Sequence, residues 1–272
     1  MGSTRGERYD LAELDLKSFT RSSIRTKVMF TLLDEGKTAN ELQNIMNTRS
    51  TTILHSMKSL MESGLVEKKQ QKYCLTNIGK IQAIMLNELV DTIVTIKEHH
   101  SFWLHHDLSG IPDELQKRIG MLGHGEIFRD PKETPLKSLD YFLAALSSSR
   151  EMRGVSPVTI RGYPEAISHM IKCGAHVELI LTNPVIEVII REHGEMLREM
   201  LVRDNFKLYS LDMDVKVAFI VTESYLNLGL SRADGSFDLG ADLIYTGEQA
   251  ISWGNMLYNH YLSLSTRFIT FG

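Results

Sequence analysis

The sequence predicts an α+β chain in two parts: a small domain of three helices and a β-hairpin, followed by a larger α/β domain. Three observations predict this fold class. Residues 21–80 hold three short amphipathic segments that run into a basic, β-prone stretch. Residues 80–100 form a long apolar stripe without Gly or Pro. Beyond Pro112, β-prone runs alternate with helical ones, which is typical of an α/β layer fold.

Composition indicates a soluble globular chain. Of its 272 residues, 43% are hydrophobic and 24% are charged, which fits one large domain or two small ones. No apolar run approaches the roughly 18–20 residues of a membrane span, and the start has neither a signal-peptide core nor an acylation pattern, because Gly6 stands where Ser or Thr is needed. We expect a cytoplasmic protein without membrane contact, with Cys74 and Cys173 reduced.

Charge is unevenly distributed along the chain. Residues 21–80 carry ten Lys and Arg against five Asp and Glu, so this stretch is +5 and the remainder of the −4 chain is −9. A basic module on an acidic body predicts a polyanion partner for the first part. A solvated basic face is the alternative.

Three helices are predicted from caps and periodicity. The first is capped by Ser22 and Ser23, carries Ile24, Val28 and Leu32, and ends at Gly36. Thr38 and Glu41 form a capping box at the start of the second. The third spans 49–63, with Ile53, Met57, Leu60 and Met61 turned inward and Gly64 after its end. Residues 65–66 and 73–75 then flank the basic run 67–72 as a hairpin.

This order of elements is that of a winged helix-turn-helix, which places its third helix in the DNA major groove. The pattern Leu60, Gly64-Leu65-Val66, Tyr73, Leu75-Thr76 and Gly79 resembles the ArsR-like winged-helix repressors of archaea over about sixty residues. The resemblance implies double-stranded operator DNA as the partner.

Polar residues at helix starts, along the third helix and in the wing are the predicted DNA contacts. Arg49 can form a bidentate hydrogen bond to guanine, and the wing lysines suit contacts to phosphates. For each single residue, an exposed side chain without a role is the alternative. The predicted contacts are Thr38, Thr48, Arg49, Ser50, Thr51, Thr52, His55, Lys58, Lys68, Lys69 and Lys72, and Ser59 is also expected to face outward.

The connecting segment 80–108 is predicted to be a helix whose apolar stripe is buried by a second subunit, which would make a homodimer, or by its own body. His99, His100, His105, His106 and Asp107 invite a metal site. We instead interpret them as helix C-terminal residues, because they cannot all converge. No metal or cofactor is expected.

The third part, 109–272, is predicted to be an α/β output domain with a mostly parallel sheet. Its expected helices are 113–122, 136–147, 163–172, 184–201 and 247–265. Its expected strands lie within 123–128, 152–158, 176–182, 206–210, 217–222 and 225–230. The remaining part of the chain, 1–79, is the winged-helix domain.

Two resemblances bear on this domain. "FWLHHDLSGIP" (Phe102–Pro112), "VELILT" (Val177–Thr182), "DGSFD" (Asp234–Asp238) and "AISWGNMLYNHY" (Ala250–Tyr261) resemble the output domain of methanogen winged-helix regulators. "DVKVAFIV" followed by "YLNLGLSRADGSFD" is more distantly similar to the phospholipase-D-like fold. The positions matching that fold's His, Lys and acid hold Asp214, Lys216 and Val221, so the resemblance implies a catalytically dead version.

A sensor domain needs a ligand site, which open α/β sheets place beyond the carboxyl ends of their strands. On the predicted strands, Ser156, Thr182, Asn183 and Arg232 are there and suit a small polar or anionic molecule. Loop and cap roles are the alternative for each.

The sequence therefore predicts a one-component, sequence-specific transcriptional regulator that is not an enzyme and that senses a small molecule or a protein partner. The alternatives are a winged-helix adaptor in the transcription machinery and an unrecognised phosphodiester enzyme.

Overall fold

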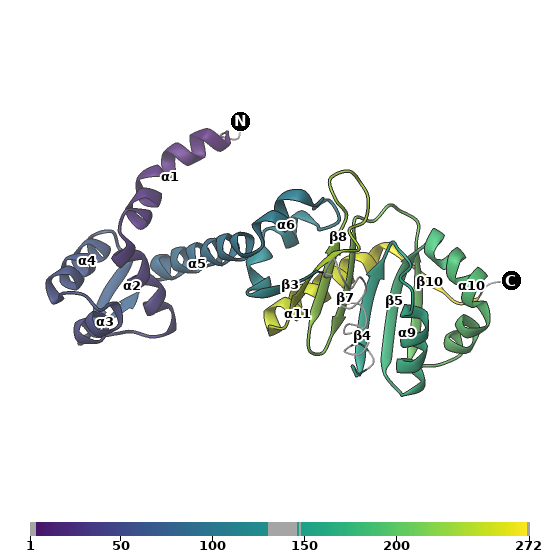
Figure 1. The fold of residues 1–272 in the computed structure, drawn as a ribbon. Coiled ribbons are helices and arrows are strands. Elements are labelled where there is room, and N and C mark those ends of the chain that lie inside the picture. Colours follow the sequence, from purple (N-terminus) through teal and green to yellow (C-terminus); the bar gives the residue numbers. More distant parts are fainter. Residues whose placement is uncertain (1–3, 130–145, 147, 271–272) are drawn as a thin grey trace. The chain divides into compact units, whose positions relative to one another are not determined.

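The computed structural model describes residues 4–129, 146 and 148–270 (Figure 1). The chain divides into two compact units, Met1–Val90 and Asp91–Gly272. Elements of the N-terminal unit are α1 (Arg5–Thr20), α2 (Ser23–Asp34), α3 (Ala39–Met46), α4 (Ser50–Glu62), β1 (Val66–Lys69), β2 (Lys72–Leu75) and the first part of α5 (Asn77–Glu98). The three predicted helices and the hairpin thus occur in the predicted order.

Local signals set the ends of these helices. Ser22 Oγ accepts a hydrogen bond from the Arg25 backbone N–H at 3.4 Å and so caps α2. The predicted capping box is confirmed at α3, where the Thr38 backbone N–H donates to Glu41 Oε2 at 2.7 Å and lowers the pKa of Glu41. Asn47 ends α3 with a φ of 45°, and Gly64 follows α4 with a φ of +69°.

The motif that links α4, the hairpin and α5 is held by direct contacts. Thr76 Oγ1 donates to the Gly64 carbonyl at 2.7 Å and accepts from the Gly79 N–H at 3.1 Å. A Cβ on Gly79 would lie 2.0 Å from the Leu65 carbonyl oxygen, so only glycine fits there. Leu65, Val66 and Tyr73 are buried. The motif therefore fixes the start of α5 against the turn after α4.

α1 was not predicted, because it lacks a buried apolar stripe. Its Leu11 and Leu14 are 83% and 80% exposed. It begins with a capping box: the Thr4 hydroxyl accepts from the Glu7 backbone N–H, and the Glu7 carboxylate accepts from the Thr4 N–H. Thr-x-x-Glu was the available signal for this helix.

α5 carries the predicted apolar stripe on its surface. Ile81, Met85 and Leu89, spaced by four residues, are 64%, 60% and 53% exposed. No helix within the described ranges is both long enough and apolar enough to cross a membrane. In the described part of the chain, the stripe is thus an exposed apolar surface of α5.

The C-terminal unit contains one large sheet with its helices. After α5 come α6 (His100–His105), α7 (Asp113–Gln116), the 3-10 helix η1 (Ile119–Leu122), β3 (Gly125–Arg129), β4 (Glu151–Ser156), α9 (Tyr163–Lys172), β5 (His176–Thr182), α10 (Asn183–Leu201), β6 (Phe206–Leu211), β7 (Val217–Thr222), β8 (Leu226–Leu230), β9 (Ala241–Tyr245), α11 (Glu248–Leu264) and β10 (Thr266–Phe268). The predicted helix 113–122 is thus two short turns, and β9 and β10 were missed. The predicted helix 136–147 lies outside the described residues apart from Leu146.

The prediction of a mostly parallel sheet is wrong. The strand order is β10-β6-β5-β4-β7-β8-β9-β3, and only the β4–β5 and β5–β6 pairs are parallel. The other five pairings are antiparallel. Crossover helices α9 and α10 join the parallel strands, whereas β7 and β8 form a hairpin and make their half of the sheet antiparallel.

Helices cover the two faces of this sheet. α11 packs on one face against β4, β7 and β8, while α9 and α10 pack on the other against β5 and β6 (Figure 1). Alternate residues of β7 follow this division: Phe219 and Val221 belong to the core on the α11 side, and Ile220 belongs to the core under α9 and α10. The second face continues over β7, β8 and β9.

Candidate nucleic-acid interface

The exposed face of α4 is the predicted reading surface. Ile53, Ser56, Met57 and Leu60 are buried, so the helix turns one face to the core. Thr51, His55 and Lys58 lie opposite them at i, i+4 and i+7, and all three are exposed. Ser50 and Thr52 are exposed as well. The predicted α4 side chains therefore share accessible surface.

Two details of α4 differ from the prediction. Met61, expected inside, is 38% exposed. Ser59, expected to face outward, is half-buried and accepts a hydrogen bond from Arg25 Nη1 at 3.0 Å. Arg25 thereby ties α2 to α4. A long-range contact of this kind has no signal in local periodicity.

The start of α4 and the turn before it carry three further predicted residues. Arg49 is the N-cap residue, is exposed, and makes no capping side-chain hydrogen bond. Thr48 is half-buried, and its N–H donates to the Gln43 carbonyl at 3.3 Å. The Thr38 hydroxyl donates to Glu41 Oε2 at 2.8 Å. Thr38 is therefore a capping residue, and we do not include it in the proposed interface.

The hairpin places the wing lysines on its strands rather than at its tip. The turn consists of Gln70 and Gln71, and Gln70 has a φ of 56°. Lys68 pairs with Tyr73 across the strands, with its Nζ 5.6 Å from the ring centroid. Lys69 lies directly opposite Lys72. Opposed like charges destabilise a hairpin, which indicates that Lys69 and Lys72 serve binding rather than the stability of the hairpin.

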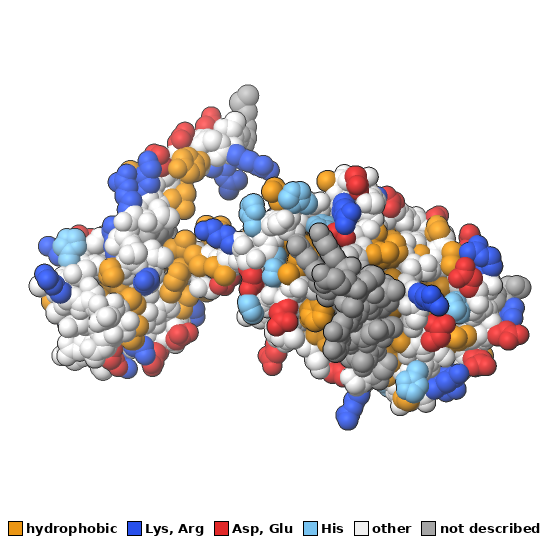
Figure 2. All heavy atoms as spheres, viewed as in Figure 1, with side chains coloured by type: hydrophobic (Ala, Val, Ile, Leu, Met, Phe, Trp, Pro, Cys, Tyr) orange, Lys and Arg blue, Asp and Glu red, His pale blue; other side chains and the backbone are white. Residues whose placement is uncertain are grey.

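Ion pairs neutralise only some of these cations. Lys69 Nζ lies 2.8 Å from Glu67 Oε1, and this hydrogen bond raises the pKa of Lys69. Lys58 lies 3.9 Å from Glu62. Within the described part of the chain, no ion pair engages Arg49, Lys68 or Lys72. Figure 2 shows a histidine side chain and basic side chains on the surface over α4.

Three of the four predicted ligand residues lie together at the ends of the parallel strands β4 and β5, because Ser156 pairs with Leu181, which directly precedes Thr182 and Asn183. Arg232 lies apart from them, after β8. Ser156 ends β4, and its hydroxyl donates to the Val158 carbonyl at 2.7 Å. Thr182 is buried at the end of β5, and Asn183 begins α10. Arg232 is ion-paired with Asp238, with Nη2 2.8 Å from Oδ1, and that pair raises the pKa of Arg232. Of the four, only Ser156 lines the cavity described below.

The positions matched to the phospholipase-D-like pattern lie in and before β7. Asp214 is ion-paired with Lys216 at 2.5 Å, and Val221 is buried in the strand. The histidines after α5 have different partners: His99 Nε2 lies 2.9 Å from the Gly125 carbonyl oxygen, and His106 Nε2 lies 3.2 Å from Asp238 Oδ2. No group of three metal-ligating side chains occurs among the described residues.

Family models match both parts of the chain. Residues 13–94 match the model described as the N-terminal domain of methanogenesis regulatory protein FilR1, and residues 135–264 match the model of the middle domain of the same protein. The methanogenesis regulatory protein FilR1 of Methanothrix harundinacea (strain 6Ac) is 31% identical over 256 residues, which is 92% of this chain and 57% of the relative. The chain thus spans little more than half of that relative.

Solved structures show weaker likenesses. The archaeal chromatin protein TrmBL2 is 12% identical with a TM-score of 0.44, covering 96% of this chain and 99% of the other. A phospholipase D family member, Nuc from Salmonella typhimurium, is 11% identical with a TM-score of 0.39, covering 54% of this chain and 99% of the other.

Proposed function

We propose that this chain is a DNA-binding transcriptional regulator of the FilR1 family, because 92% of the chain is homologous to methanogenesis regulatory protein FilR1. In this proposal the N-terminal unit is an ArsR-like winged helix-turn-helix that binds operator DNA. The C-terminal unit receives a signal and so changes the affinity for DNA. A signal can change the affinity for DNA only if it binds the DNA-binding state and the non-binding state of the protein with different free energies, and the change is limited to that difference.

The observation that carries the proposal is the polar, unobstructed face of α4 beside a lysine-bearing hairpin. Thr51, His55 and Lys58 suit base edges and phosphates in the major groove, with Arg49 at the helix start. Leu54, 48% exposed on α4, adds an apolar contact suited to a thymine methyl group. Lys68, Lys69 and Lys72 supply phosphate contacts that position the unit.

We further propose that the protein acts as a homodimer in the cytoplasm. The exposed stripe Ile81, Met85 and Leu89 supports the dimer, because burial of such a stripe is favourable. Two copies of α4 would then meet two half-sites of an operator.

Footprinting of the full chain on DNA from its source organism, at two salt concentrations, tests this function. We expect a few protected sites with half-site symmetry. Arg49→Ala should lower affinity for these sites about tenfold or more while leaving affinity for random DNA nearly unchanged. Arg203→Ala, an exposed arginine of the C-terminal unit, is the matched control and should change neither.

Protection that is diffuse and lost at the higher salt would contradict sequence-specific binding. Absence of binding to any DNA would favour the adaptor function instead. An equal loss for Arg49→Ala on all sequences would remove base reading from the role of Arg49.

A further inference from the structure

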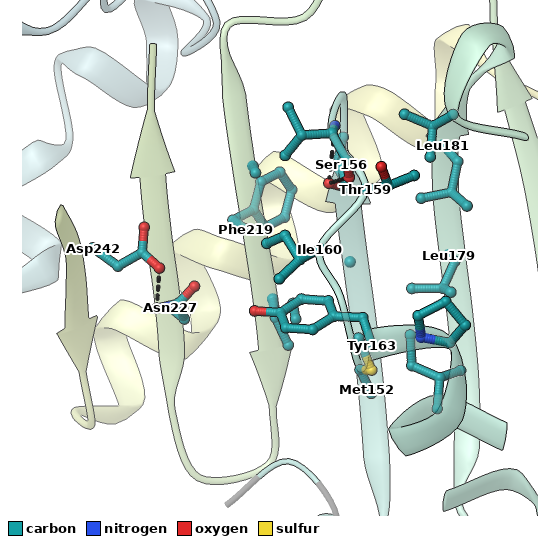
Figure 3. A pocket seen from close by; sticks show the side chains of 18 of the residues that line it. Met152, Ser156, Thr159, Ile160, Tyr163, Leu179, Leu181, Phe219, Asn227 and Asp242 are labelled. Atoms are coloured by element: carbon teal, nitrogen blue, oxygen red, sulfur yellow. Dashed lines mark hydrogen bonds between the residues drawn. The ribbon is translucent and has the colours of Figure 1, made fainter. Parts of the chain in front are cut away.

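A cavity of about 190 Å³ lies on one face of the C-terminal sheet. Residues of strands β4 to β9 line it, and helices α9 and α10 with the segment 156–160 form its walls (Figure 3). It is distinct from the proposed DNA-binding face, since all its described lining residues belong to the C-terminal unit.

Small residues on neighbouring strands open this space. Gly154 of β4 and Ala218 of β7 line the cavity. Ala218 pairs with Gly229 of β8, where a Cβ would lie 2.5 Å from Asp242 Oδ1. Gly229 thus makes room for the Asp242 side chain on the same face. Larger side chains at these positions would fill the space or displace the carboxylate.

The walls are apolar apart from a few polar groups. Met152, Ile160, Leu179 and Leu181 are among the apolar side chains that line the cavity (Figure 3). Ile220 of β7 also lines it. Asp242 is the acidic residue among the described lining residues, and none of those residues is Lys, Arg or His. Among the described lining residues, the cavity therefore offers a negative group and no cationic side chain.

Asp242 is half-buried and partnered by an amide. Asn227 Nδ2 donates to Asp242 Oδ2 at 3.4 Å, a long and weak hydrogen bond. Burial raises the pKa of Asp242 to about 6, and the Asn227 hydrogen bond acts in the opposite direction. Tyr163 projects from the start of α9 toward the same region (Figure 3), and burial raises its pKa. A carboxylate in such surroundings gains from a cationic partner.

The volume limits the size of the ligand. An apolar cavity of roughly 150 Å³ accepts benzene, so about 190 Å³ accommodates one ring with a short side chain. Apolar walls with a few placed polar groups are the usual composition of small-molecule sites.

We propose that this cavity binds a small monoamine with an apolar body about the size of one aromatic ring, whose ammonium group donates to the Asp242 carboxylate. The charge of the cavity disfavours the anionic ligand that the sequence suggested. Its role as the signal site rests on the proposed regulator function, whereas the binding itself does not.

Calorimetric titration of the full chain at pH 7.5 tests the proposal with three matched probes: phenethylammonium, the neutral 2-phenylethanol and the anionic phenylacetate. We expect phenethylammonium to bind most tightly and phenylacetate most weakly. Asp242→Asn should weaken phenethylammonium binding about tenfold or more, because hydrogen bonds to charged groups contribute about that factor, and should leave 2-phenylethanol within about threefold.

Two further variants serve as controls. Asp212→Asn removes an exposed carboxylate just after β6 and should leave all three affinities unchanged. Ala218→Phe should abolish binding of all three probes by filling the floor of the cavity. Circular dichroism of each variant checks that it is folded.

Equal affinities for the three probes, or an unchanged phenethylammonium affinity in a folded Asp242→Asn, would overturn the proposal. DNA binding is measured separately without any amine. Amine binding without DNA binding would therefore support the cavity proposal and contradict the regulator proposal. DNA binding without a preference for the cationic probe would support the regulator proposal and contradict the cavity proposal.

Discussion

At the scale of single residues, the sequence predicts roles well where the partner is nearby in the chain. Thr38 and Glu41 are three residues apart, and their capping box forms as expected. Asp242 could not be found this way. It meets Asn227 only through the pairing of β8 with β9, and β9 was itself missed. Ser59 was misplaced for the same reason, because its partner Arg25 lies on another helix.

The raised pKa of Asp242 predicts a pH-dependent stability. A native pKa of about 6, above the ordinary aspartate value of 3.8, means that the folded protein holds this proton more tightly than the unfolded chain. The contribution of Asp242 to stability should therefore fall as pH rises from about 4 to about 6, and stay low above that. Asp242→Asn should remove this dependence and gain up to about 3 kcal/mol relative to the parent between pH 4 and pH 7.

Urea unfolding followed by circular dichroism at pH 4, 5, 6 and 7 measures this difference. Asp212→Asn is the control and should track the parent at each pH. A difference between Asp242→Asn and the parent that is constant with pH would show that the Asp242 carboxyl titrates normally.

At the scale of elements, periodicity and caps predicted most helices and most strands, but not their partners. α9 and β5 begin and end where the sequence indicates, since amphipathic spacing and a buried apolar run are local. The direction of strand pairing is not local. β7 follows β6 in the chain yet pairs with β4, which no spacing in either strand reveals. β10 is only three residues long, too short for a pattern.

The exposed stripe of α5 predicts how the proposed homodimer is built. Met85→Glu with Leu89→Glu should convert the dimer to monomer, because burying two carboxylates in an apolar interface is costly. Both positions are exposed within one chain, so the monomer should keep its helix content. Sedimentation velocity measures the change. Glu88→Lys, which alters charge but not the apolar stripe, should leave the dimer intact.

A parent protein that sediments as a monomer would contradict this assignment of the stripe, as would a double variant that remains dimeric.

At the scale of the whole molecule, the chain holds separate cores. One cluster centres on Val28, Met29, Leu42, Ile53 and Met57 of the N-terminal unit, and the others lie on the two faces of the C-terminal sheet. Charge asymmetry and the change of pattern near Pro112 predicted two kinds of domain. The proposed division at 79 and 108 remains a prediction, since the contact boundary falls inside α5 at residues 90 and 91.

Separate cores predict separable unfolding. Leu42 and Leu228 are both completely buried, one in each unit, so each Leu→Ala change should cost about 2–5 kcal/mol. In differential scanning calorimetry of the full chain, Leu42→Ala should lower the midpoint of one transition and Leu228→Ala that of another. A single transition lowered equally by both variants would show that the units unfold together.

The placement of the tryptophans gives this chain a built-in optical label. Trp103 and Trp253 are its two tryptophans, and both lie in the C-terminal unit. Trp253 is completely buried, with its indole N–H donating to the Leu115 carbonyl at 3.0 Å, and Trp103 stands edge-on to Phe102. Tryptophan emission, excited at wavelengths where tyrosine does not absorb, therefore comes from the C-terminal unit. With a dye attached to the DNA, the unlabelled protein can report two events in one sample. Tryptophan emission reports binding of the signal to the C-terminal unit, and dye emission reports release of the operator, both in real time.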